Sequence, residues 1–278
     1  MSLTKWQVFR RTIQKKLVCI IAISFLPLLA FSQGLEFNLR LQNTTSSRVA
    51  DVRMEAAMPL SLDARAYNWK VESQSPFVLE GNNLVFSVGD FAPYQVKHVK
   101  VYFEGMGAKA ERAAASGSDA YPLTANPSPE LLALSARFAG LSQQEKIQAI
   151  YLWMVENIAF TGIDRQVEGA NAALLSKSGD CTEHMLLAGE LLARNGVRVR
   201  RVFGVVLPSQ YPKISPSLFH DWLEAFDGDT WVLFDSTYKV YREALGVDYA
   251  GLYYYGFGSG FKRQAFQVHL NQIYVYLN

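Results

Sequence analysis

Cysteine is scarce in this chain, which has two in 278 residues, Cys19 and Cys181. Cys19 lies within residues 1–32, whose composition is that of a removable targeting segment. Cys181 is therefore expected to be the only thiol of the mature chain, and a single cysteine cannot form an internal disulfide. In an oxidising compartment such a thiol is either buried and inert or retained for its reactivity, and burial is the simpler alternative.

Acidic residues are absent from residues 1–32, which carry five Lys and Arg residues ahead of an apolar run at 17–31. The segment ends in Ala-Phe-Ser, which suits a cleavage site. We therefore predict a secretory signal peptide and an exported protein, periplasmic or extracellular. An uncleaved anchor is the alternative, but the run is shorter than the roughly 20 residues of a membrane span and contains Pro27. No lipid-attachment motif precedes Cys19.

The rest of the chain lacks a basic run and a second long apolar segment. Five of the 27 basic residues and none of the 25 acidic ones lie in residues 1–32, so the net charge falls from +2 to −3 once that segment is removed. Neither nucleic acid nor a stable membrane span after signal cleavage is therefore expected. No acidic cluster suggests calcium, and no cofactor is implied. The sequence does not indicate the oligomeric state.

Half of the residues are apolar, which is enough for one large core or two modest ones. At 33–104, short alternating runs separated by turn residues predict a small antiparallel β-sandwich. Residues 105–128 are rich in Gly, Ala, Ser and Pro and are predicted to form a linker. Residues 129–278 begin with helical patterns and end with strand patterns, the last at 266–277. They predict an α+β domain with helices packed on an antiparallel sheet.

The run Gly-Asp-Cys-Thr-Glu-His at 179–184 sets the remaining cysteine at the start of a helix. Apolar residues recur at helical spacing over 181–194, and an Asn-Gly pair ends the pattern. Asp180 is the expected N-cap, and Glu183 follows three residues later in the capping-box relation. Unpaired N–H groups and the helix dipole stabilise a thiolate in the first turn, so Cys181 is the candidate nucleophile.

Four histidines lie beyond residue 32, and His220 is the best candidate for a base that serves Cys181. Its strand-like run leads into Asp227-Gly228, a dipeptide that favours a two-residue type I′ hairpin turn. With that turn, His220 is predicted to lie directly opposite Asp235, with Cβ atoms about 5 Å apart. A carboxylate beside an imidazole fixes its tautomer and raises its basicity.

The other histidines have simpler explanations. His184 shares the helix face of Cys181 and is either an alternative base or an ordinary helix residue. His98 and His269 lie in strand-like runs with no acidic or thiol neighbour and are expected to be plain sheet residues. A metal site made of Cys181, His184 and His220 matches no established zinc spacing, so no metal is expected.

Residues 126–240 resemble the transglutaminase-like domain, a branch of the papain-like cysteine enzymes found in many exported bacterial proteins. The resemblance rests on the helix at 147–155, the run at 179–184, His-Asp-Trp at 220–222 and the strand at 231–237. It implies that Cys181 is the nucleophile, His220 the general base and acid, and Asp235 the residue that orients His220. The family often begins with a β-sandwich.

Two positions depart from the family pattern. The small residue that usually follows the histidine is Asp221 here, and the proline that usually follows the aspartate is Ser236. Neither change removes a catalytic group. In a strand, Asp221 is expected to point away from the neighbouring His220, and it adds charge near the cleft.

The implied chemistry is acyl transfer through a thioester on Cys181, acting on an amide bond of a protein or peptide substrate, either a glutamine carboxamide or a peptide bond. The chain would act as a transglutaminase, an amidase or a cysteine protease. The Cys181 N–H is the expected oxyanion donor, and the loop at 161–166 is a candidate for the second donor. The alternative is a non-catalytic binding or scaffold protein of the cell envelope with a closed cleft. The loop at 207–217, ahead of His220, is predicted to be a lid or a substrate rim.

Overall fold

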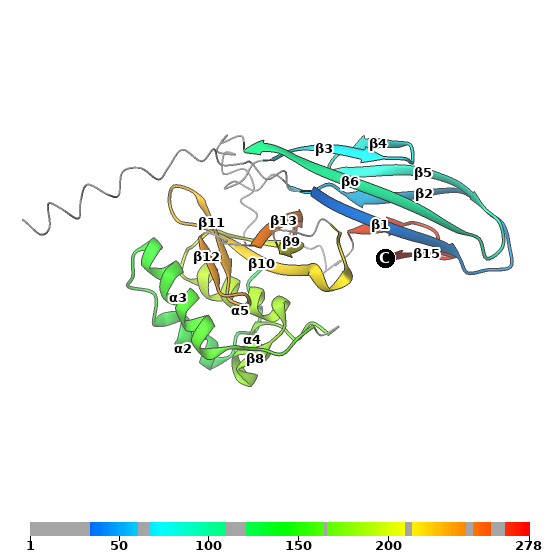
Figure 1. Cartoon of the computed structure of the whole chain (residues 1–278). Coiled ribbons are helices and arrows are strands. Elements are labelled where there is room, and N and C mark those ends of the chain that lie inside the picture. Colours follow the sequence, from blue (N-terminus) through cyan, green and yellow to red (C-terminus); the bar gives the residue numbers. More distant parts are fainter. Residues whose placement is uncertain are drawn as a thin grey trace, which may run out of the picture. The chain divides into compact units, whose positions relative to one another are not determined.

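The computed structural model describes residues 34–60, 67–108, 121–163, 166–208, 213–242, 247–256 and 265–278. The predicted signal peptide lies outside these ranges. Two four-stranded sheets, a five-stranded sheet and a set of helices confirm the predicted α+β class (Figure 1). No helix in the described ranges is long and apolar enough to cross a membrane.

The two four-stranded sheets form the predicted β-sandwich, with strand orders β15-β1-β6-β3 and β14-β2-β5-β4. Its N-terminal strands are β1 (Gly34–Asn43), β2 (Val49–Ala57), β3 (Tyr67–Ser73), β4 (Phe77–Glu80), β5 (Asn83–Phe91) and β6 (Val96–Ala108). Every second residue of β1 is buried, as expected for a strand with one face on the core. Phe37 of the first sheet contacts Phe266 of the second at a ring-centroid distance of 5.0 Å. The two sheets therefore share one core.

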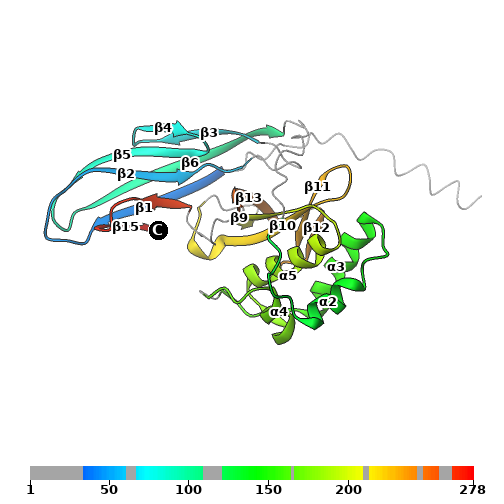
Figure 2. The same cartoon turned by 180° about the vertical axis from the view of Figure 1, so that it is seen from behind.

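The last two strands, β14 (Phe266–Val268) and β15 (Ile273–Leu277), belong to this sandwich. β15 pairs with β1 (Figure 2), and β14 pairs with β2, in both cases antiparallel. The sequence analysis grouped these strands with the C-terminal half, and the structure corrects that placement. A strand pattern does not say which sheet edge the strand joins, and β15 covers the N–H and C=O groups along the edge of β1.

Part of the predicted linker is ordered against the helix of the cysteine. The Tyr121 hydroxyl donates to the Leu186 carbonyl oxygen at 2.9 Å, and the Thr124 N–H donates to the Glu190 carboxylate at 3.0 Å. A Cβ on Gly189 would lie 2.4 Å from the Tyr121 ring, so this glycine permits the close contact. Residues 105–108 already belong to β6, and residues 109–120 lie outside the described ranges.

The C-terminal half contains the helices and the five-stranded sheet, in the order β12-β11-β10-β9-β13. The helices are α2 (Pro129–Ala136), α3 (Gln143–Asn157), α4 (Ala170–Ser176) and α5 (Cys181–Arg194). The sheet strands are β9 (Val199–Pro208), β10 (Phe219–Phe226), β11 (Trp231–Asp235), β12 (Val240–Arg242) and β13 (Val247–Tyr254). The short strands β7 (Ala159–Phe160) and β8 (Ser178–Gly179) pair in parallel, and the 3₁₀ turn η1 (Pro216–Leu218) precedes β10. The helices gather against one side of the sheet (Figure 1).

Strand β10 lies at the centre of this sheet and is buried along almost its whole length. Leu223 lies in the core cluster that also contains Leu187 and Leu191 of α5. Trp222 points to the other face, where it meets Tyr249 of β13 at a ring-centroid distance of 5.1 Å. Both faces of β10 are thus covered, and near its start the Asp221 side chain bonds to Thr182 in the first turn of α5.

Candidate active site

Helix α5 begins at Cys181 with the predicted capping box. The Asp180 carboxylate accepts hydrogen bonds from the N–H groups of Thr182 at 2.7 Å and Glu183 at 3.4 Å. The Glu183 carboxylate in turn accepts the Asp180 N–H at 3.4 Å. These bonds satisfy two of the open N–H groups of the first turn and do not engage the N–H of Cys181. The buried Cys181 side chain is thus held at the positive end of the helix.

Gly179 makes the tight entry into α5 possible. A Cβ at this position would lie 2.3 Å from the Glu183 Cβ. We expect Gly179→Ala to force the capping box apart and to lower the free energy of unfolding by about 1–3 kcal/mol, as in an overpacked core. Chemical denaturation measures the loss. The matched control is Gly140→Ala, because a Cβ there meets no atom within 4 Å. Equal stability of the two variants would contradict the prediction.

Asp221 ties the start of α5 to the sheet. Its carboxylate accepts the Thr182 hydroxyl at 2.6 Å and the Tyr255 hydroxyl at 2.7 Å. Burial lowers the pKa of Arg201, a buried guanidinium of β9, and the Asp221 charge acts in the opposite direction. Asp221 does not bond to His220 and lines the pocket beside it, as expected from the sequence. These two hydrogen bonds, which a small residue could not make, explain the aspartate at this position.

His220, at the start of β10, bonds to Asp235, at the end of β11. The imidazole Nε2 lies 2.7 Å from the Asp235 Oδ2, and both side chains are buried. The register that predicted this pair is wrong, because Leu223 pairs with Phe234 and Phe226 pairs with Trp231. Continued along the strands, this pairing sets His220 diagonal to Asp235 rather than directly opposite.

The Asp235 carboxylate is held by four hydrogen bonds. Oδ2 accepts from His220 and from the Tyr249 hydroxyl at 2.7 Å, and Oδ1 accepts the N–H groups of Thr237 at 2.8 Å and Tyr238 at 3.2 Å. Burial alone would raise the pKa of Asp235, but His220 and the hydroxyl and N–H donors outweigh it and lower the pKa. The carboxylate is therefore ionised and fixed in orientation.

The His220 imidazole lies between Asp235 and Cys181. Burial alone would lower its pKa, but the Asp235 charge, the bond to Asp235 and a hydrogen bond with Cys181 raise the pKa to about 10. Because Nε2 faces Asp235, Nδ1 is the ring nitrogen available to the thiol. The Tyr238 ring lies against the imidazole at a centroid distance of 4.5 Å. These contacts favour a protonated imidazole at neutral pH.

The remaining histidines do not join this constellation. His184 is buried, its Nδ1 lies 2.9 Å from the Ser236 hydroxyl, and burial lowers its pKa. This contact gives Ser236, the second departure from the family pattern, a local role. His98 is exposed on β6, and His269 is exposed and lies 2.9 Å from the Glu55 carboxylate of β2. Within the described ranges, no group of His, Cys, Asp and Glu residues could hold a metal ion.

Tyr249 and Tyr255 were not predicted from the sequence. Tyr249 lies on β13 and donates to Asp235, and Tyr255 follows β13 and donates to Asp221. The segment at 247–254 is rich in tyrosine and apolar residues, which are typical of a strand, although Gly251 and a register shift beside it weaken the signal. No sequence signal pairs these two tyrosines with their carboxylates.

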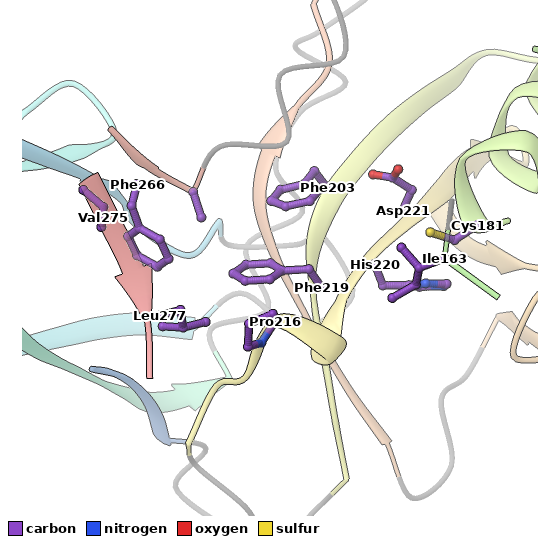
Figure 3. A pocket seen from close by; sticks show the side chains of 11 residues that line it. Ile163, Cys181, Phe203, Pro216, Phe219, His220, Asp221, Phe266, Val275 and Leu277 are labelled. Atoms are coloured by element: carbon purple, nitrogen blue, oxygen red, sulfur yellow. The ribbon is translucent and has the colours of Figure 1, made fainter. Parts of the chain in front are cut away.

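Cys181 and His220 open into a pocket of about 400 Å³ (Figure 3). Ile163 lies at this end of the pocket with 65% of its surface exposed. It belongs to the loop considered for a second oxyanion donor, in which residues 164–165 lie outside the described ranges. Pro216 also lines the pocket, so the end of the loop ahead of His220 forms part of the rim. The pocket thus reaches the Cys181 side chain.

Residues 133–236 match the family model described as the transglutaminase-like superfamily. No curated protein matches the chain. A cysteine protease candidate from Cytophaga hutchinsonii is similar in structure, at 14% identity and a TM-score of 0.40 over 88% of this chain and 90% of that one. The periplasmic domain of TgpA from Pseudomonas aeruginosa gives 16% identity and a TM-score of 0.41 over 75% and 89%. LapG from Legionella pneumophila gives 12% and 0.37 over 46% and 72%.

Proposed function

We propose that the chain is a thiol acyl-transfer enzyme that acts on amide bonds, with residues 133–236, which match the transglutaminase-like superfamily, as its catalytic domain. Its catalytic residues are Cys181, His220 and Asp235. The proposal rests on one observation: His220 is hydrogen-bonded to Asp235 on one side and to Cys181 on the other. A nucleophile, a base in contact with it and a third group that orients the base are the elements of nucleophilic catalysis.

In the first step, the Cys181 thiolate attacks the carbonyl carbon of the amide and forms a C–S bond. The C–N bond then breaks, and the departing nitrogen takes the proton of the His220 imidazolium, so that an amine leaves and a thioester remains. The raised pKa of His220 keeps this proton available at neutral pH. Asp235 stabilises the imidazolium and keeps its Nδ1 directed at the sulfur.

The negative oxygen of the tetrahedral intermediate needs hydrogen-bond donors. The N–H of Cys181 points out of the first turn of α5, and the capping bonds go to Thr182 and Glu183 instead. We assign it as one oxyanion donor, worth roughly 10²- to 10³-fold in rate when such a donor is preorganised. The helix dipole adds to the same stabilisation.

In the second step, water or an amine attacks the thioester carbon, its proton passes to His220, and the Cys181 thiolate leaves. Water gives hydrolysis, as in an amidase or a protease, and a lysine amine gives a crosslink, as in a transglutaminase. The substrate we propose is a protein or peptide outside the cytoplasm. The export assignment rests on the composition of residues 1–32.

The experiment that tests this proposal is the rate of Cys181 alkylation by iodoacetamide as a function of pH, in wild type and in His220→Ala. In wild type we expect a fast rate well below pH 8.5, the value at which a free thiol ionises, because the imidazolium stabilises the thiolate. In His220→Ala, the rate should fall roughly tenfold or more at pH 6–7 and then rise like that of an ordinary thiol.

His269→Ala is the matched control, because this histidine is exposed and lies on the sandwich. It should alkylate like wild type. A wild-type rate that follows a free thiol, or no reaction in the folded protein, would refute the enzyme proposal and favour the binding or scaffold protein.

A further inference from the structure

The pocket at Cys181 has a second wall that comes from the sandwich. Phe203 and Phe219, on β9 and β10, line the side nearer the cysteine, whereas Phe266, Val275 and Leu277, on β14 and β15, line the far side (Figure 3). These last residues lie some 80 to 100 positions beyond Cys181 in the sequence. The two C-terminal strands thus line the same pocket as Cys181.

The pocket changes character along its length. Cys181, His220 and Asp221 are the polar lining residues, and they cluster at one end. Asp221 accepts the hydroxyls of Thr182 and Tyr255 and therefore presents an engaged carboxylate. The other lining residues that the structure describes are apolar. A charged or strongly hydrated group would lose its water against these apolar side chains without gaining a hydrogen bond from them.

Three aromatic rings connect the two walls. Phe203 stacks on Phe219 at a centroid distance of 5.3 Å and an angle of 7°. Phe219 meets Phe266 edge to face at 6.4 Å and 72°. Phe266 in turn packs against Phe37 in the sandwich core at 5.0 Å. The sandwich therefore supports the far wall directly, and the wall is continuous with a buried core.

The rim between the walls is also tied to the sandwich. The Ile214 N–H donates to the Glu36 carbonyl oxygen of β1 at 3.0 Å, and Glu36 forms a parallel bridge with Lys213. Ile214 is buried, and Pro216, two residues later, lines the pocket. β1 thus positions the segment that leads into His220. The pocket is built jointly by the sandwich and the five-stranded sheet.

We infer that this pocket is an acyl-side subsite, selective for a bulky apolar side chain, aromatic or branched aliphatic, next to the reacting carbonyl, with β14 and β15 as its selective wall. This inference rests on the proposed function. The substrate class is thereby narrowed to peptides or proteins with an apolar residue on the acyl side of the amide. The sandwich acts as a specificity module of the catalytic site.

Two features support this occupant. The volume of about 400 Å³ exceeds the roughly 150 Å³ of a cavity that holds benzene, so a phenylalanine-sized side chain fits with room for neighbouring backbone. The pocket begins at the Cys181 sulfur, to which the acyl group stays bonded after the amine has left. The acyl part is therefore the portion of the substrate that the pocket can hold throughout the reaction.

The test uses two N-acylated amino acid fluoromethyl ketones that differ only in the residue whose carbonyl is electrophilic, which is phenylalanine in one and serine in the other. Second-order inactivation of Cys181 is measured by mass spectrometry. Wild type should prefer the phenylalanine probe by about 10- to 100-fold, the ratio expected for burial of an aromatic side chain. Iodoacetamide, which is too small to use the pocket, reports the thiolate independently.

Leu277→Asp should lower the phenylalanine-probe rate roughly tenfold or more and leave the iodoacetamide rate within about twofold. The matched control is Tyr276→Asp, because Tyr276 is the preceding residue of β15 and is 43% exposed. Its two rates should both stay near those of wild type. Leu277→Ala keeps an apolar wall and is less disruptive to folding than the aspartate variant. It should reduce the preference for the phenylalanine probe by only a few-fold.

Fast iodoacetamide alkylation without a preference for the phenylalanine probe would overturn this inference and leave the proposed function intact. An equal loss of preference in Leu277→Asp and Tyr276→Asp would overturn it as well, because the effect would then not belong to the pocket wall. Slow alkylation that follows a free thiol would instead refute the enzyme proposal itself.

Discussion

Replacement of Cys181 by serine is expected to abolish acyl transfer while the fold is retained. A hydroxyl fits the same space but is not ionised by the His220 imidazolium, so the loss should be roughly 10⁴-fold or more. The assay is the p-nitrophenyl ester of an N-acylated phenylalanine, whose acyl transfer releases p-nitrophenolate. Wild type should show a burst of about one equivalent per chain and an acyl adduct by mass spectrometry, if deacylation is the slower step.

The same assay distinguishes the two outcomes of the second step. An added primary amine such as cadaverine competes with water for the thioester, and the ratio of amide to acid products measures how well the site excludes water. Circular dichroism of Cys181→Ser checks the fold. An undiminished burst in this variant would show that another residue is acylated and would remove Cys181 from the mechanism.

The hairpin between His220 and Asp235 shows how far local sequence rules reach. Asp227-Gly228 predicted a two-residue turn, but the Asp227 carboxylate accepts the N–H groups of Asp229 at 3.1 Å and Thr230 at 3.0 Å, which makes a longer loop. The pairing moves by two residues. An even shift keeps each side chain on its face, so the imidazole and the carboxylate still meet.

The start of α5 was predictable because its signals are local. Asp180 and Glu183 lie within one turn of Cys181, and their capping bonds do not depend on any distant segment. The positions of Tyr249 and the strand β15 could not be predicted in this way. Their contacts with Asp235 and β1 join residues far apart in the chain, and tertiary packing rather than propensity decides them.

The function proposed for the sandwich could not be predicted from its local sequence either. Its alternating strands were readable from 33–104, but nothing in them indicated a role at the active site. The role that we propose comes from two strands at the other end of the chain, β14 and β15. They belong to the sandwich by pairing and line the pocket at Cys181 through Phe266 and Leu277.

Asp235→Asn is expected to lower the steady-state rate with the same ester by roughly 10³- to 10⁴-fold, with little loss of stability. The asparagine carbonyl oxygen can still accept the N–H groups of Thr237 and Tyr238, which now bond to Oδ1. Its amide nitrogen would then face His220 Nε2 as a donor. The imidazole must place its proton on Nδ1, toward the sulfur, and the anion that stabilises the imidazolium is lost.

The pH profile identifies this cause. In wild type, the Asp235 charge holds the His220 pKa near 10, so the imidazolium persists as the pH rises and is lost only around that value. Without the charge, the pKa should fall to or below the ordinary value of about 6.5. The alkaline limb of the burst rate, which reports acylation by the thiolate and imidazolium pair, should therefore move down by several pH units. Asp229→Asn is the matched control, since Asp229 lies exposed in the same hairpin loop and should leave both the rate and the limb unchanged. An unmoved limb in Asp235→Asn would show that Asp235 does not set the protonation of His220.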